Sequence, residues 1–296
     1  MLKILLLLFV ASLLVSISPA GAETMNLNPK GEAAVKTVVK EGAKELVLTV
    51  TTPTHELLFS EKSAWTIRQM SFNGKLLLSQ TGAFGSVATS KGIGWEGTGH
   101  GHETVEKIEL EVDGKSHTPA DGMKVSGDKF VLKKQSRFGP YRHHSIITLD
   151  GKNLHEKFDY EVVEDDSKVT FIYGFMHCMS NRTDKWMAQP SDGEVLKGEF
   201  LDDNSYTLKQ DIRWAAIYSS ADEIGFVYMY PEAYKGMKPL HNFFWNRPRD
   251  NKLYFRPYLP RGIGKKFGYE VTLQAFSSAP EKWEGSANEI VAELKK

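Results

Sequence analysis

Residues 92–103, GIGWEGTGHGHE, form the densest run of chemically active side chains in the sequence. This stretch combines five glycines with Trp95, His100, His102 and two carboxylates. Glycine loses the most conformational entropy when a helix or strand orders it, so the composition predicts a loop that lies close to a ligand. Residues two apart in an extended segment point the same way, and we therefore expect His100 and His102 to converge.

Two converging imidazoles suggest three interpretations. A histidine titrates near neutrality and suits removal of a proton next to a sugar carboxylate. Two imidazoles could also bind zinc, which needs a further protein ligand, or they could be solvated residues of a plain surface loop. We predict proton transfer by His100 or His102, with Glu103 as a further acid–base candidate, and we expect no metal and no cofactor.

A second group of candidates lies at the start of a strand-like segment, from Tyr141 onward. Tyr141 or His143 could supply the partner acid, and Arg142 could neutralise a substrate carboxylate, because a guanidinium binds a carboxylate through two parallel hydrogen bonds. Tyr141 and His143 alternate with the apolar positions that follow them, so burial in the core is the alternative for both.

Two polar residues fall on strand faces that should be buried, Glu156 and His177. A buried carboxylate is costly without a partner, so Glu156 should pair with an arginine or histidine, or open onto a concave binding face. His177 ends the alternating stripe Phe171, Tyr173, Phe175 and His177, which is either core or one wall of a binding site.

The C-terminal third supplies an aromatic and basic pattern. Tyr254, Arg256 and Tyr258 alternate onto one face of a strand, and Trp245 and Arg247 precede them. Aromatic rings beside a fixed guanidinium suit a sugar that carries a carboxylate, although an exposed sheet face with cation–π contacts is the alternative. The predicted substrate-binding set is Trp95, Arg142, His177, Trp245, Arg247, Tyr254 and Arg256.

The elements that must position these residues have a period of two. In Lys107–Val112 the apolar residues alternate cleanly with charged ones, and Asn73-Gly74, Asp113-Gly114 and Asp150-Gly151 are hairpin turn signals between strand-like runs. Further predicted strands are Glu45–Thr51, Trp65–Phe72, Phe130–Ser136, His143–Leu149, Leu154–Val163, Val169–His177, Trp214–Tyr218, Ile224–Tyr230, Leu253–Tyr258 and Phe267–Phe276. The pattern predicts an all-β fold, a large antiparallel β-sandwich or barrel formed as a single domain over residues 45–296.

The tail is the exception to this pattern. Ser286 and Glu289 have the spacing of a capping box, and Ala287, Ile290, Val291 and Leu294 share one face of a short C-terminal helix.

The N-terminus predicts export. Lys3, an apolar run over residues 4–15 and the small residues Ala20-Gly21-Ala22 have the form of a signal peptide cleaved after Ala22, followed by a polar leader over residues 23–44. We expect a secreted or periplasmic protein that has no membrane association after cleavage. An uncleaved membrane anchor is the alternative.

The composition narrows the possible partners. The formal net charge of zero disfavours nucleic acid and anionic membranes as partners. Motifs for serine hydrolases, nucleoside triphosphatases and dehydrogenases are missing from the sequence. Cys178 is the only cysteine, so no intrachain disulfide forms, and we expect a buried and inert thiol.

Three stretches carry a family resemblance: Trp65 through Lys75, the strand from Asn153 to Val162, and the closing run NKLYFRPYLPRGIGKKFGYEVTLQAF. Their order resembles the galactose-mutarotase-like supersandwich shared by aldose epimerases and by the β-domains of polysaccharide lyases. The resemblance covers most of residues 45–278. It implies a β-sandwich and a polysaccharide or oligosaccharide ligand, and it assigns no catalytic residue.

These patterns predict a carbohydrate-active protein that acts on an acidic, uronate-containing glycan. If it is an enzyme, we expect proton abstraction at a sugar carbon, as in a polysaccharide lyase or a sugar epimerase. One alternative is a glycan-binding module without turnover. The other is a glycoside hydrolase that uses Glu103 and Glu156 as a carboxylate pair.

Overall fold

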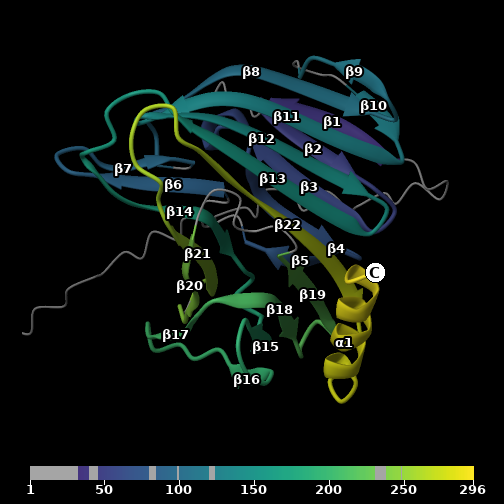
Figure 1. Cartoon of the computed structure of the whole chain (residues 1–296). Coiled ribbons are helices and arrows are strands. Elements are labelled where there is room, and N and C mark those ends of the chain that lie inside the picture. The colour runs from purple at the N-terminus through teal and green to yellow at the C-terminus, as the bar shows by residue number, and fades with distance from the viewer. Residues whose placement is uncertain are drawn as a thin grey trace, which may run out of the picture.

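Figure 1 shows the computed structural model of the chain, an all-β molecule that ends in one helix. The structure describes residues 33–39, 46–79, 85–98, 100–119, 124–230, 238–247 and 249–296. The expected signal peptide, residues 1–22, lies outside the described residues.

The described strands form three antiparallel sheets. We call the first the N-terminal sheet, and its order is β10 (Lys124–Gly127), β1 (Ala33–Val39), β2 (Leu46–Thr51), β3 (His55–Ser60), β4 (Ile67–Phe72) and β5 (Lys75–Leu78). The ten-stranded central sheet has the order β16 (Leu196–Glu199), β15 (Lys185–Pro190), β18 (Ile212–Ser219), β19 (Ile224–Met229), β22 (Lys266–Ser277), β13 (Asn153–Val162), β12 (Tyr141–Asp150), β11 (Lys129–Phe138), β8 (Glu103–Val112) and β9 (Lys115–His117). The lateral sheet has the order β17 (Tyr206–Gln210), β20 (Lys238–Trp245), β21 (Lys252–Tyr258), β14 (Val169–Cys178), β6 (Gly85–Ser90) and β7 (Gly94–Gly97).

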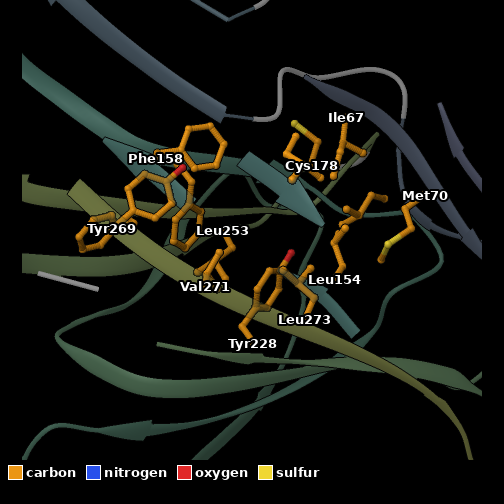
Figure 2. Close-up of a cluster of buried hydrophobic side chains, with 14 of the residues drawn as sticks. Ile67, Met70, Leu154, Phe158, Cys178, Tyr228, Leu253, Tyr269, Val271 and Leu273 are labelled. Atoms are coloured by element: carbon orange, nitrogen blue, oxygen red, sulfur yellow. The ribbon is translucent and has the colours of Figure 1, made fainter. Parts of the chain in front are cut away.

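One apolar core joins the three sheets. Its largest cluster contains Phe59 from the N-terminal sheet, Phe158 and Tyr269 from the central sheet, and Leu253 and Phe255 from the lateral sheet. Figure 2 shows part of this cluster, in which Phe158, Tyr269 and Leu253 lie together. The all-β sandwich predicted from the period of two is confirmed.

The N-terminal and lateral sheets meet at Cys178. Leu78, the last residue of β5, bridges to Met179, and the Ser79 amide donates to the Cys178 carbonyl at 2.8 Å. The Cys178 thiol is fully buried, as predicted, and burial raises its pKa to about 12. The thiol therefore stays protonated at neutral pH.

Each predicted strand is present within the described residues, and two further segments contain strands that were not expected. The polar leader contains β1, which pairs with β2 and β10. The loop expected over residues 92–103 contains β7, and Glu103 already begins β8. Glycine-rich composition did not prevent strand formation, because positive φ at Gly94 and Gly97 suits the two ends of the short edge strand β7.

The C-terminal helix α1 (Trp283–Leu294) buries Ala287, Ile290 and Val291, as predicted. The capping box was wrong. The helix begins one turn earlier than expected, at Trp283, so Ser286 lies inside it, and Lys282 at the N-cap makes no side-chain capping bond. Stacking of Trp283 on Tyr218, with ring centroids 5.2 Å apart, fixes the start of the helix instead.

Candidate functional site

A row of aromatic rings crosses the lateral sheet. Tyr206, Trp245, Tyr254, Tyr173 and Trp95 come from β17, β20, β21, β14 and β7, and we call them the aromatic row. Ring centroids of successive members are 5.4, 6.3, 4.6 and 5.9 Å apart. Because β-strands place alternate side chains on opposite faces, the row lies on the face of the sheet that points away from the core.

Strand β21 illustrates this alternation. Leu253 and Phe255 belong to the main core, whereas Tyr254 packs with Val87 and Met176 in a separate small cluster on the other face. The middle of the row is shielded, since Tyr254 is 5% exposed, while Trp95 and Tyr206 at its ends are 43% and 47% exposed. Both ends of the row are therefore open to a ligand.

Two arginines flank the row. The Arg256 guanidinium lies over the Phe171 ring at 4.4 Å, and Phe171 in turn contacts Trp95 edge-on at 5.7 Å. The Arg256 Nε is buried without a hydrogen-bond partner, and no ion pair of Arg256 occurs among the described residues. Arg247 lies over the Trp245 ring at 4.7 Å and is held 3.4 Å from the Asp250 carboxylate. The sheet thus carries fixed positive charge beside aromatic rings.

Hydrogen bonds between Gly97 and the residues His100 and Gly101 bring His100 to the same face. The His100 amide donates to the Gly97 carbonyl at 3.1 Å, and the imidazole stacks on Trp95 with centroids 5.6 Å apart. Burial, followed by the positive charge of Lys252, lowers the His100 pKa. The ring is therefore neutral at pH 7 and can accept a proton.

His102 does not follow the expected geometry. The prediction that it converges with His100 required an extended backbone, but φ is +79° at Gly101 and +59° at His102. Residues two apart do not share a face in such a turn. His102 is exposed, and no described residue contacts its side chain through a hydrogen bond or an ion pair.

Glu103 lies in the core rather than on the loop. Its carboxylate accepts hydrogen bonds from Lys134 Nζ and Ser136 Oγ, both at 2.7 Å, and both charged side chains are at most 2% exposed. Desolvation of the Glu103 carboxyl would raise its pKa, but the Lys134 charge and His143 outweigh it and lower the pKa to about 2. This arrangement fits a buried ion pair better than a catalytic acid.

Tyr141 and His143 are fully buried, and His143 lies beside this ion pair, with its Nδ1 3.6 Å from the Glu103 carboxylate. The His143 ring lies between Phe158 and Tyr160, and its Nδ1 is 3.1 Å from Ser136 Oγ. Burial raises the pKa of Tyr141 and lowers that of His143. The catalytic roles of these two residues stay predictions, and their positions favour the alternative of a core location.

The remaining candidates lie away from the aromatic row. His177 is buried between Glu156 and Tyr228. Its Nε2 lies 3.0 Å from the Glu156 carboxylate, and its Nδ1 lies 2.9 Å from the Tyr228 hydroxyl. This contact is the histidine partner expected for Glu156. Arg142 pairs with Glu161 at 2.9 Å on the outer face of the central sheet. Among the described residues, no three histidine, cysteine or acidic side chains are grouped to hold a metal ion.

Sequence reasoning missed Phe171, Tyr173 and Tyr206 as surface residues. The stripe at 171, 173, 175 and 177 suggested one face, but a β-bulge between Tyr173 and Met176 interrupts the alternation. Phe171 and Tyr173 therefore face outward, while Phe175 and His177 face the core. Tyr206 joins the aromatic row because β17 pairs with β20, and the local sequence does not indicate that pairing.

Comparison with known proteins gives the fold and little more. No protein-family model and no curated protein matches the sequence. The galactosidase domain of an alpha-galactosidase–sucrose kinase has a TM-score of 0.50 and 6% identity, over 82% of this chain and 42% of that chain. An alpha-N-acetylgalactosaminidase from Bifidobacterium bifidum has a TM-score of 0.50 and 9% identity, over 83% of this chain and 39% of that chain.

A galactose mutarotase-like protein from Clostridium acetobutylicum has a TM-score of 0.46 and 10% identity, over 82% of this chain and 97% of that chain. The chain spans about two fifths of the length of the two larger proteins. Identities this low describe the fold alone. At that level, the predicted resemblance to galactose-mutarotase-like supersandwich proteins is confirmed.

Proposed function

We propose that the chain binds an acidic glycan on the outward face of the lateral sheet. The observation that carries this proposal is Arg256, a half-buried guanidinium fixed on Phe171 that forms no ion pair among the described residues. A uronate carboxylate would supply the missing counter-charge through two parallel hydrogen bonds while the neighbouring rings contact the sugar. The sugar-related names of the similar structures support a carbohydrate ligand.

The test is a binding panel that contrasts acidic with neutral polymers. Polygalacturonate, alginate and chondroitin sulfate should bind, whereas cellulose oligomers and neutral galactan should bind more weakly. Arg256→Gln should lower affinity for the acidic polymers about tenfold, the effect of losing roughly 1.4 kcal/mol from a charged hydrogen bond.

Lys129→Gln is the control for this experiment. Lys129 pairs with Asp150 at the end of β11 opposite to Phe138, so its loss should leave affinity unchanged. Binding to none of the acidic polymers would refute the proposed function. Equal affinity of wild type and Arg256→Gln would refute the role of Arg256.

His100 favours a second candidate function, proton abstraction from the bound uronate, as in a lyase or an epimerase. The neutral imidazole stacks on Trp95 at one end of the row, where it could reach a ligand. A general base contributes about 10²- to 10⁴-fold to rate, so His100→Ala should abolish most turnover and retain binding. His144→Ala, an exposed histidine on β12, should keep full turnover.

The measurement for this candidate is ultraviolet absorbance of unsaturated uronate products during long incubation with each acidic polymer, together with anomeric or epimeric exchange by NMR. Turnover that persists in His100→Ala would assign the base elsewhere, with His102 the next residue to test. Binding without any product or exchange would leave a glycan-binding module. Treatment with a chelator should leave activity unchanged.

We also propose that the protein acts outside the cytoplasm. The basis is the signal-peptide pattern of residues 1–22. None of the helices in the described residues is long and apolar enough to cross a membrane. N-terminal sequencing of the mature protein should begin at Glu23, and retention of residues 1–22 would contradict this proposal.

A further inference from the structure

The two exposed ends of the aromatic row lie at opposite edges of the lateral sheet. Trp95 is on the edge strand β7 and Tyr206 on the edge strand β17, with four strands between them. Neighbouring strands are about 4.8 Å apart. The successive centroid distances along the row keep the rings of Trp95 and Tyr206 at most about 22 Å apart. A single sugar ring, which is about as wide as one strand spacing, can contact one end only.

The rings between the two exposed ends are in unbroken contact, although Tyr254 at the middle of the row is shielded from solvent. Trp95 leans across β6, which contributes the small residues Val87 and Thr89 here, and stacks on Tyr173 with planes 17° apart. Tyr173 contacts Tyr254, and Tyr254 contacts Trp245, which stacks on Tyr206. No strand of the sheet therefore interrupts the apolar contact between one edge and the other.

Two arginines place positive charge at separate points along the row. Arg256 lies over Phe171 near the Trp95 end, and Arg247 lies over Trp245 near the Tyr206 end. Arg256 pairs in register with His241 of β20, six residues before Arg247, so roughly 20 Å of chain separates the two arginines and one carboxylate could not meet both. A ligand that carries a carboxylate on more than one of its units would match the spacing.

We infer that the natural ligand is a chain of several uronate units that lies across the strands and contacts Trp95 and Tyr206 at the same time. This inference rests on the proposed function, since it specifies the length and direction of the glycan at that site. Each end contact made by the same chain raises the effective concentration of the other, so affinity rises with chain length until both ends are engaged.

The test compares disaccharides with octasaccharides prepared from polygalacturonate and from alginate, by calorimetry on the full mature chain. The octasaccharide should bind at least tenfold more tightly than the disaccharide. Trp95→Ala and Tyr206→Ala should each weaken octasaccharide binding about five- to tenfold and reduce the advantage of length. Leu196→Ala, an exposed apolar residue on β16 of the central sheet, is the control and should bind like wild type.

Urea unfolding of each variant tests whether a loss of affinity reflects a loss of the fold. Equal affinities for disaccharide and octasaccharide would overturn the inference and leave the proposed function intact. An octasaccharide affinity that is unchanged in Trp95→Ala or in Tyr206→Ala would also overturn the inference and leave the proposed function intact. Failure of both oligosaccharide families, together with the whole acidic panel, would refute the proposed function itself, and this inference with it.

Discussion

At the scale of single residues, Glu103 shows how a side chain with catalytic chemistry can serve the core instead. The carboxylate is in contact with Lys134, which also donates to the Ala64 carbonyl at 2.7 Å. Ser136 Oγ completes the arrangement, so the buried charges have near partners. The ion pair ties the start of β8 to β11 and to the turn before β4.

We expect Glu103→Gln to destabilise the fold by about 3–5 kcal/mol, because it leaves the Lys134 ammonium buried without a counter-charge. Urea unfolding followed by tryptophan fluorescence measures the loss. Glu109→Gln removes one partner of the exposed pair with Lys107 and should leave the unfolding midpoint unchanged. A Glu103→Gln variant as stable as wild type would show that the buried pair contributes nothing.

The same carboxylate predicts a dependence of stability on pH. The Glu103 pKa falls from an ordinary 4.5 to about 2 in the folded chain, so the folded state binds fewer protons in that interval. Its contribution, about 3 kcal/mol, is fully present above pH 4.5 and is lost as the pH falls towards 2. The difference in unfolding free energy between wild type and Glu103→Gln should shrink over this interval, and a constant difference would contradict the assignment.

At the scale of elements, the short strand β7 positions the Trp95 end of the aromatic row. Its strand pairing is with β6 only, and the amide of its last residue, Gly97, donates to the Gly101 carbonyl at 3.1 Å, which holds His100 close to the strand. Gly97 has φ of +105°, and a Cβ there would lie 2.5 Å from the Ser86 carbonyl oxygen. The close approach of β7 to β6 therefore depends on this glycine.

Gly97→Ala should destabilise the fold more than Gly92→Ala. Both residues have positive φ, which costs an alanine about 1–2 kcal/mol, but a Cβ at Gly92 meets no atom within 4 Å. Gly97→Ala must also move the Ser86 backbone, so we expect a loss of about 3 kcal/mol or more in urea unfolding. Equal losses of unfolding free energy in the two variants would mean that β7 can move away from Ser86 without a free-energy cost.

At the scale of the whole molecule, a single core cluster contains residues from all three sheets. The N-terminal sheet has no separate core among the described residues, since Leu48, Phe59 and Ile67 pack into the same cluster as Phe158 and Phe255. A sheet that shares its apolar contacts with two others cannot unfold without exposing them.

The described residues should therefore unfold in one cooperative step. Far-ultraviolet circular dichroism reports the strands, and tryptophan fluorescence reports mainly the central and lateral sheets; the two urea transitions should coincide. A fluorescence change at lower urea than the change in circular dichroism would show that the lateral sheet unfolds separately.

The sequence predicted the features that depend on local residue patterns, and it missed the features that depend on contacts between distant segments. Strands with strict alternation, such as Asn153–Val162, and the buried face of the helix followed from period alone. The bulge after Tyr173 and the pairing of β17 with β20 did not, because both depend on contacts between distant segments. The histidine-rich turn was found from composition, but its contact with Trp95 depended on strand geometry that composition does not encode.

The position of Cys178 offers a chemical measure of how often two sheets separate. Its protonated, fully buried thiol lies where β5 meets β14, so a thiol reagent can reach it only during opening. Under native conditions, the rate of alkylation divided by the rate for an unfolded cysteine gives the free energy of that opening. Because the chain has no second thiol, the reaction reports this one junction, and a mass increase at Cys178 could be followed without introducing any label.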